Sequence, residues 1–133
     1  MALQYSSNIY LGRLDLVEST TGASALLKIY SGSPTANCAA AAPTGLLATL
    51  TLPSDWMNAA SGTTKTLLGS WTGTASGGSA TAPASFRIYN NGDTVCHIQG
   101  PAGVGSGDLQ VNGSITAGQT VTVTSFTLTA ANT

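Results

Sequence analysis

Short β-branched segments separated by turn residues limit the folds open to this chain more than any other feature. Ser24–Ser31, Gly45–Leu52 and Gln119–Thr129 are rich in Val, Ile, Leu and Thr, and turn residues interrupt the chain every few residues between such runs. No alternation of strands with helices supports a parallel sheet. We therefore predict a mainly β fold of seven to eight strands, an antiparallel β-sandwich of the jelly-roll type.

The domain organisation follows from length and from a change in composition near the N-terminus. A chain of 133 residues fits one domain. Residues 1–22 hold a helix-like pattern, whereas the remainder reads as strands and turns. We predict an N-terminal arm or short helix over 1–22 and a β-sandwich domain over 23–133.

Helical spacing marks the first segment. Its periodic apolar residues are Tyr10, Leu14 and Val17. Ser7 is a candidate N-cap, and Gly22 lies where a helix would end. The pattern favours a helix or arm, and a strand over Leu14–Val17 is the alternative.

The hairpin between Phe86 and Ile98 has two possible registers. A two-residue turn at Asn91-Gly92 would place Phe86 and Ile88 on one face with Val95 and His97. A three-residue loop over residues 90–92 would place them with Cys96 and Ile98. We prefer the three-residue loop, because it buries four apolar groups. The side chains that it leaves facing solvent are Arg87, Tyr89, His97 and Gln99.

The last strand changes phase part-way along. Val121 and Val123 occupy odd positions, and Phe126 and Leu128 occupy even ones. One extra residue at Thr124–Ser125 would return all four side chains to one face. The pattern therefore predicts a β-bulge at that point.

Charged residues make up only 7% of the chain, and the net charge is −1. The four Lys and Arg residues are spread too widely to form a nucleic-acid-binding stripe. No apolar run approaches the ~18 residues that span a bilayer. Asp15 and Glu18 are expected on a solvated helix face. The sparse charge has two readings: an assembly covers much of the surface, or Thr, Ser and Asn hydrate it sufficiently.

The two cysteines are predicted to be free thiols. No secretory signal precedes them in the sequence, and two cysteines form no dense framework. A reducing cytoplasm is the expected site of synthesis. A Cys38–Cys96 disulfide is the alternative.

The sequence gives little support for a catalytic or metal-binding site. Cys96 and His97 are strand neighbours that point to opposite faces, and His97 is the only histidine. Two cysteines and one histidine are too few for a metal site, and no carboxylates pair at useful spacing. Trp56 and Trp71 read as core anchors, with sugar-stacking platforms as the alternative. We predict no enzyme activity, no cofactor and no metal.

Several stretches, read together, resemble a family of small structural proteins of tailed bacteriophages. They are "LQYSSN", "LLATLTLPSDWM", "GSWTGTAS", "FRIYN" and "TVCHIQG", with "GDLQVNG" and "ITAGQTVTVTSFTLT" closing the series. The most specific are Leu46–Met57 and Cys96–Thr129. Relatives tend to carry alanines where this chain has Leu11-Gly12, which gives them a more helical start.

The resemblance implies a virion role. The function expected of such a protein is capsid decoration, in which a homotrimer clamps neighbouring subunits of the major capsid protein. Its location would be the capsid exterior, after assembly in the host cytoplasm, with no nucleic-acid or membrane partner. The alternative is a tail or fibre module that binds host glycans or proteins through Trp56, Tyr89 and the glycine-rich loops.

A decoration protein needs groups that reach its neighbours. Residues 1–12 would supply an arm, because aromatic and large apolar groups carry interface energy well. The predicted partner-contacting residues are Tyr5, Ile9, Tyr10, Arg13 and Tyr89.

Overall fold

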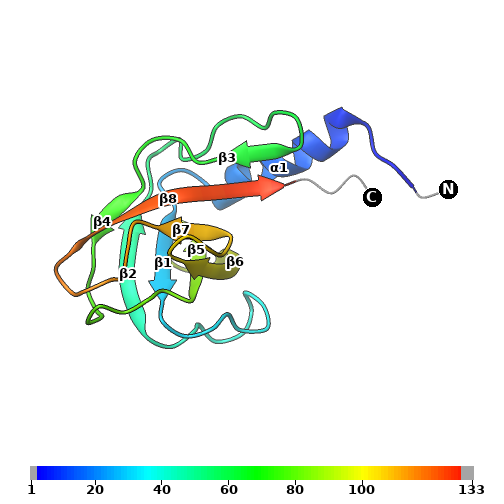
Figure 1. Ribbon diagram of the computed structural model, residues 1–133. Helices are drawn as coiled ribbons and strands as arrows, with labels where there is room; N and C mark the ends of the chain where they lie inside the picture. The colour runs from blue at the N-terminus through cyan, green and yellow to red at the C-terminus, as the bar shows by residue number, and fades with distance from the viewer. Residues whose placement is uncertain (1–2, 130–133) are drawn as a thin grey trace.

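The computed structural model describes residues 3–129, which form one helix and eight strands (Figure 1). In chain order the elements are α1 (Ser7–Thr21), β1 (Leu26–Tyr30), β2 (Leu46–Thr51), β3 (Thr64–Thr66), β4 (Thr72–Thr74), β5 (Ser85–Tyr89), β6 (Cys96–Gly103), β7 (Leu109–Val111) and β8 (Thr120–Thr129). The mainly β class, the strand number and the N-terminal helix are confirmed. The N-cap is Ser6, one residue before the predicted Ser7.

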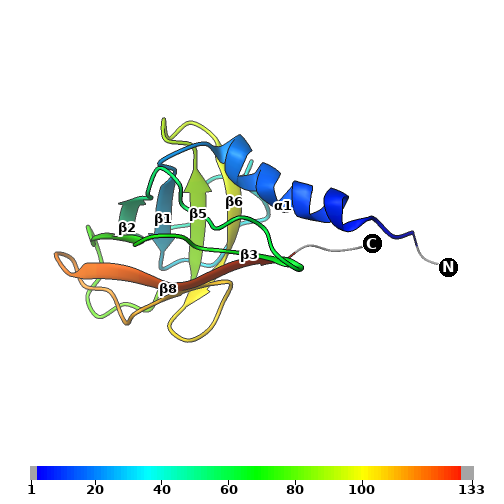
Figure 2. The same cartoon turned by 90° about the horizontal axis from the view of Figure 1, so that it is seen from above.

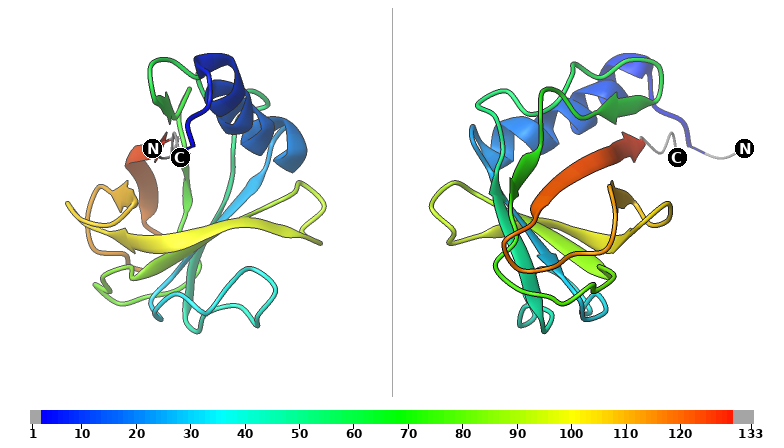
Figure 3. Two further views of the ribbon diagram at one scale, coloured as in Figure 1. Left: turned by 90° about the vertical axis from the view of Figure 1, so that its right-hand side faces the viewer. Right: turned by 60° about the vertical axis from the view of Figure 1, so that its left-hand side comes forward.

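The strands form one curled sheet of mixed direction. Their order is β2-β1-β5-β6-β7-β8-β3, and β4 pairs with β8. All pairings are antiparallel except the short one between β6 and β7. The sheet curls until Ala48 of β2 meets Ala75 beside β4, so its two ends approach each other (Figure 3).

The curled sheet encloses one apolar core. Trp71 lies at its centre, with its ring centroid 5.8 Å from that of Trp56 and 5.3 Å from that of Phe126. The indole N–H of Trp71 donates to the Trp56 carbonyl, so the buried nitrogen is satisfied. Both tryptophans are core anchors, as predicted, and neither offers a surface for stacking a sugar.

The predicted bulge in β8 is confirmed. Gln110 of β7 pairs with Ser125, whereas Val111 pairs with Val123, so Thr124 is the extra residue. Phe126 therefore returns to the buried face shared by the valines. The bulge, which bends the strand locally, therefore explains the phase change in the sequence.

The β5–β6 hairpin differs from the prediction at its turn. Ile98 shares the face of Ile88, as expected, but it pairs with Ile88 directly, and a register shift then pairs Tyr89 with Cys96. The three-residue loop is wrong. The connection is longer because the Asn90 side chain accepts hydrogen bonds from the Thr94 and Val95 amides. The shift moves Cys96 away from the core face.

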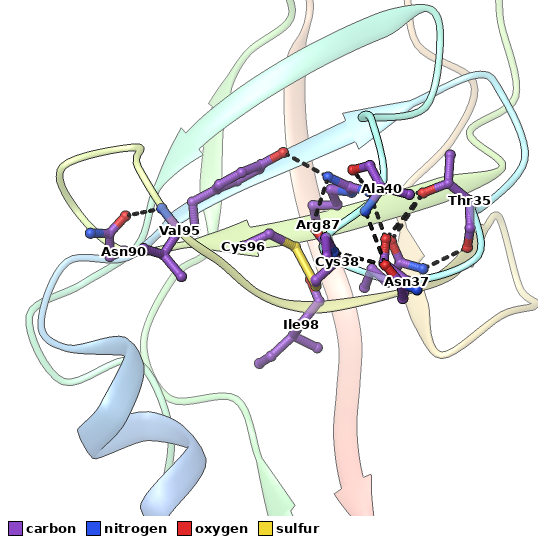
Figure 4. The surroundings of a disulfide bond; sticks show 12 residues. Thr35, Asn37, Cys38, Ala40, Arg87, Asn90, Val95, Cys96 and Ile98 are labelled. Carbon is purple, nitrogen blue, oxygen red and sulfur yellow. Dashed lines mark hydrogen bonds between the residues drawn. A yellow bond between two sulfur atoms is a disulfide. The ribbon is translucent and has the colours of Figure 1, made fainter.

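A disulfide joins Cys38 to Cys96, so the prediction of free thiols is wrong (Figure 4). The register shift brings Cys96 to the outer face of the sheet, where residues 33–44 pass. The two Cα atoms lie 5.4 Å apart, within the ordinary range for a disulfide. The bridge fastens this long loop, called here the outer loop (residues 33–44), onto the sheet.

Arg87 is buried beneath the outer loop, so its predicted place in solvent is also wrong. Its guanidinium donates to the Thr35 hydroxyl at 2.8 Å and to the carbonyls of Asn37, Ala40 and Ala41 at 3.0–3.2 Å (Figure 4). The guanidinium thus satisfies loop carbonyls that no regular secondary structure pairs. Gln99 adds a bond from its amide nitrogen to the Thr35 carbonyl.

Candidate functional site

The inner face of α1 carries the predicted apolar stripe. Leu14 and Thr21 are buried, and Tyr10 and Val17 are half-buried. These positions recur at helical spacing, so one side of α1 lies against the body of the protein. Figure 2 shows α1 crossing one end of the sheet, with its first turns projecting past β6.

Two carboxylates fasten α1 to the strand and loop beneath it. Asp15 and Glu18 contact the buried ammonium of Lys65 in β3 at 2.8 and 3.1 Å. Asp15 also accepts from the Ala60 amide, and Glu18 from the Met57 amide. The predicted exposure to solvent is confirmed for Asp15, which is 53% exposed, and wrong for Glu18, which is 19% exposed. What the sequence did not predict is the counter-charge, which comes from a lysine nearly fifty residues on.

The electrostatics of this cluster favour the charged forms. The hydrogen bond from Lys65, with a second from the Ala60 amide, lowers the pKa of Asp15. Burial alone would lower the pKa of Lys65, but the hydrogen bonds to Asp15 and Glu18 outweigh it and raise that pKa. The cluster is therefore a charged clamp across the neutral range.

The C-terminal end of α1 is held by Trp56. Its indole N–H donates to the Gly22 carbonyl at 2.9 Å, while the Gly22 amide donates to the Glu18 carbonyl. Gly22 has a φ of 92°, which L side chains rarely adopt. Glycine therefore ends the helix at the predicted place and turns the chain into β1.

The flank of α1 next to the inner face exposes apolar groups. Ile9 is 49% exposed and Leu16 60% exposed, and Leu3 before the helix is 71% exposed. Ile9, Arg13 and Leu16 follow i, i+4, i+7 spacing, so they share one side of the helix, called here the outer face of α1. The Arg13 guanidinium lies 4.7 Å from the centroid of the Tyr5 ring.

A pocket of about 220 Å³ borders this outer face. Arg13, Leu16, Val17 and Thr20 line it from the helix, and His97 closes it from β6. The pocket gives the outer face a concave margin, and its two nitrogen-bearing side chains offer hydrogen-bond donors to an acidic group.

The structure brings four of the five predicted contact residues together. Tyr5, Ile9, Tyr10 and Arg13 lie in α1 or just before it, although Tyr10 turns toward the body. The sequence reading missed Leu3 and Leu16. The i, i+7 spacing of Leu16 from Ile9 is a signal that would have found it.

Tyr89 lies elsewhere, in β5 on the outer side of the sheet. Its ring lies 5.0 Å from the Lys28 ammonium, and its hydroxyl accepts from Arg87 at 3.4 Å. Burial, together with a hydrogen bond with Tyr89, raises the pKa of Tyr30 well above its usual range. Tyr89 is thus half-buried in a polar cluster beside the outer loop, separate from the α1 residues.

Residues 3–129 show no group of three or more His, Cys, Asp or Glu placed to hold a metal ion. In that same span no helix has the length and apolarity to cross a bilayer. No protein-family model, curated protein or solved structure matches the chain. The outer face of α1 is therefore the candidate site that the geometry defines best.

Proposed function

We propose that this protein decorates a bacteriophage capsid, docking onto the major capsid protein through the outer face of α1. One observation carries the proposal. The inner face of α1 is fixed by the charged clamp and by Trp56, yet Ile9 and Leu16 remain exposed on the flank beside it. A rigid helix that presents large apolar groups fits a docking element.

The energetics suit attachment in many copies. A few large apolar groups on one helix give a modest contact, and symmetry multiplies modest contacts into stable attachment. In this proposal the protein acts as a homotrimer, and each copy presents one helix. Because the outer face holds few charges, its binding should depend only weakly on salt.

The disulfide supports a location on the capsid exterior. Disulfides persist on virion surfaces and are rare in the reducing cytoplasm. A protein assembled in the host cytoplasm would therefore complete the Cys38–Cys96 bridge after release. We also propose that the curled sheet is a jelly-roll-like relative of the antiparallel β-sandwich expected from the sequence.

The test is binding to empty heads by co-sedimentation. Deletion of residues 1–12, or the double substitution Ile9→Asp with Leu16→Asp, should abolish binding and leave a folded domain by circular dichroism. The matched control is Val104→Asp, which alters a similarly exposed valine in a loop after β6. Undiminished binding by the double variant would refute docking through α1.

A further inference from the structure

Two strand edges in the curled sheet have no neighbour among residues 3–129. Over Cys96–Gly100, β6 pairs with β5 on one side only, and it meets β7 later, at Ala102 and Gly103. Over Thr127–Thr129, β8 pairs only with β3. The parallel contact between β6 and β7 is so short that the sheet opens beyond it (Figure 3).

A groove of about 280 Å³ lies between these two edges, called here the seam. Phe86 and Phe126 line it from the core, and their rings meet edge to face at 5.6 Å. Ile98 and Leu128 flank them, and both are only partly buried although they pack on the core. Apolar side chains therefore form the bottom of the seam, and the described residues cover them only in part.

The rim of the seam is polar. Gln99, Thr127 and Thr129 line it together with the exposed carboxylate of Asp108. Asp108 enters none of the ion pairs formed within residues 3–129. An occupant therefore meets unpaired strand edges, apolar side chains and one carboxylate.

We propose that the seam accepts an extended segment of a different protein, which adds a strand between β6 and β8. A strand places alternate side chains on opposite faces, so apolar residues of the segment would cover Ile98 and Leu128. Its backbone would satisfy the two open edges, as in other cases of strand addition. A lysine or arginine at its end would pair with Asp108.

The charge of the rim favours a separate protein over this chain's own segments as the occupant. Of its four basic residues, Lys28, Lys65 and Arg87 lie in paired strands and bind Asp93, the α1 clamp and the outer loop. The fourth, Arg13, lies within α1 beside Tyr5. Among residues 3–129 a second copy therefore offers no extended basic segment, and we assign the seam to a separate protein.

The experiment uses two synthetic peptides and the complete chain. Both peptides are capped and alternate Thr with Val; one is flanked by Lys at both ends, and its twin by Glu. Amide hydrogen exchange followed by NMR reports on Cys96–Gly100 and Thr127–Thr129. The Lys peptide should slow exchange along both edges and bind about threefold more tightly than its twin.

A charge reversal tests the role of Asp108. Asp108→Lys should reverse the preference of the protein toward the Glu peptide, whereas Asp55→Lys, the same change at another exposed aspartate, should not. Exchange unchanged by millimolar peptide, or a preference indifferent to Asp108→Lys, would overturn the proposal. Concentration-dependent protection of both edges in the free protein would assign the seam to a second copy instead, and would equally overturn it.

The outcome is separate from that of the capsid experiment. The peptide assay contains no capsid, so its failure leaves docking through α1 standing. Loss of capsid docking would likewise leave strand addition at the seam intact.

Discussion

Replacing Lys65 with methionine should release α1 from the body of the protein. The Lys65 side chain is 2% exposed and is the only cation that the structure gives to Asp15 and Glu18 within residues 3–129. Methionine keeps much of the apolar stem and removes the ammonium. Both carboxylates would then still accept hydrogen bonds from the Ala60 and Met57 amides, but they would lose the positive charge that pairs with them.

The magnitude follows from the exposure of each partner. Asp15 is 53% exposed, so solvent screening limits its pair with Lys65 to about 0.5 kcal/mol. Glu18 is 19% exposed, and its charge-assisted bond is worth about 1.5–3 kcal/mol. Removing a buried ammonium recovers part of its desolvation cost. We expect a net loss of about 2 kcal/mol, or a fall in Tm of about 6–8 °C.

Chemical denaturation and amide exchange check this expectation. Exchange across Ser7–Thr21 should accelerate up to about 30-fold, the equivalent of 2 kcal/mol. The matched control is Lys28→Met, which removes a more exposed lysine paired with Asp93 and should cost less than about 1 kcal/mol. If Lys65→Met costs no more than Lys28→Met, or leaves helix exchange unchanged, the clamp does not hold α1.

Four further predictions concern the clamp, the outer loop and β8. Because the pKa of Asp15 is lowered, its contribution to stability is present at neutral pH and should disappear as the pH falls through that lowered value. Because the pKa of Lys65 is raised, its contribution should disappear only as alkaline pH passes that raised value. Thermal melts of Lys65→Met should lose the alkaline dependence and show a weaker acid one, since the Ala60 amide still lowers the pKa of Asp15. Replacing both cysteines with serine should cost about 4 kcal/mol in guanidinium denaturation, from the loop entropy of a bridge spanning 58 residues; a cost below about 1 kcal/mol would contradict this. Arg87→Lys should lose about 2 kcal/mol and speed amide exchange in the outer loop, because the lysine ammonium lacks the second nitrogen that donates to the Cys38 carbonyl and the Tyr89 hydroxyl; unchanged exchange would show that the disulfide suffices. Deleting Thr124 should leave a cooperative thermal melt, because removal of the extra residue puts Phe126 two positions after Val123 and so on the same buried face; loss of the cooperative melt would refute the assignment of the bulge.

Local pattern was enough to predict several elements. The spacing of Tyr10, Leu14 and Val17 specified the helix, because one helical face must be buried for so short a segment to persist. The slip between Val123 and Phe126 specified the bulge, because a strand alternates with a period of two.

Local sequence patterns could not predict contacts between residues that lie far apart in the chain. Nothing near Arg87 indicates that a loop fifty residues earlier will supply carbonyls to its guanidinium. Lys65 similarly supplies the counter-charge to Asp15 and Glu18, and a one-residue register shift determines whether Cys96 can reach Cys38. The local bonds of Asn90 lengthened the hairpin connection, and the other errors arose where a tertiary contact overrode a local pattern.

The candidate site was predicted in part for the same reason. Tyr5, Ile9 and Arg13 could be selected because the helix places them on one side or next to it. Tyr89 could not be placed, since its position depends on the pairing of β5 with β1. The seam left no local signal, because an open edge is defined by strands that fail to meet.

The copy number of the protein in purified phage particles tests the central claim most directly. Quantitative mass spectrometry against the major capsid protein would measure it. Decoration predicts on the order of hundreds of copies per particle, in a fixed ratio to the capsid subunit. About a dozen copies or fewer would place the protein in a tail or fibre and contradict capsid decoration.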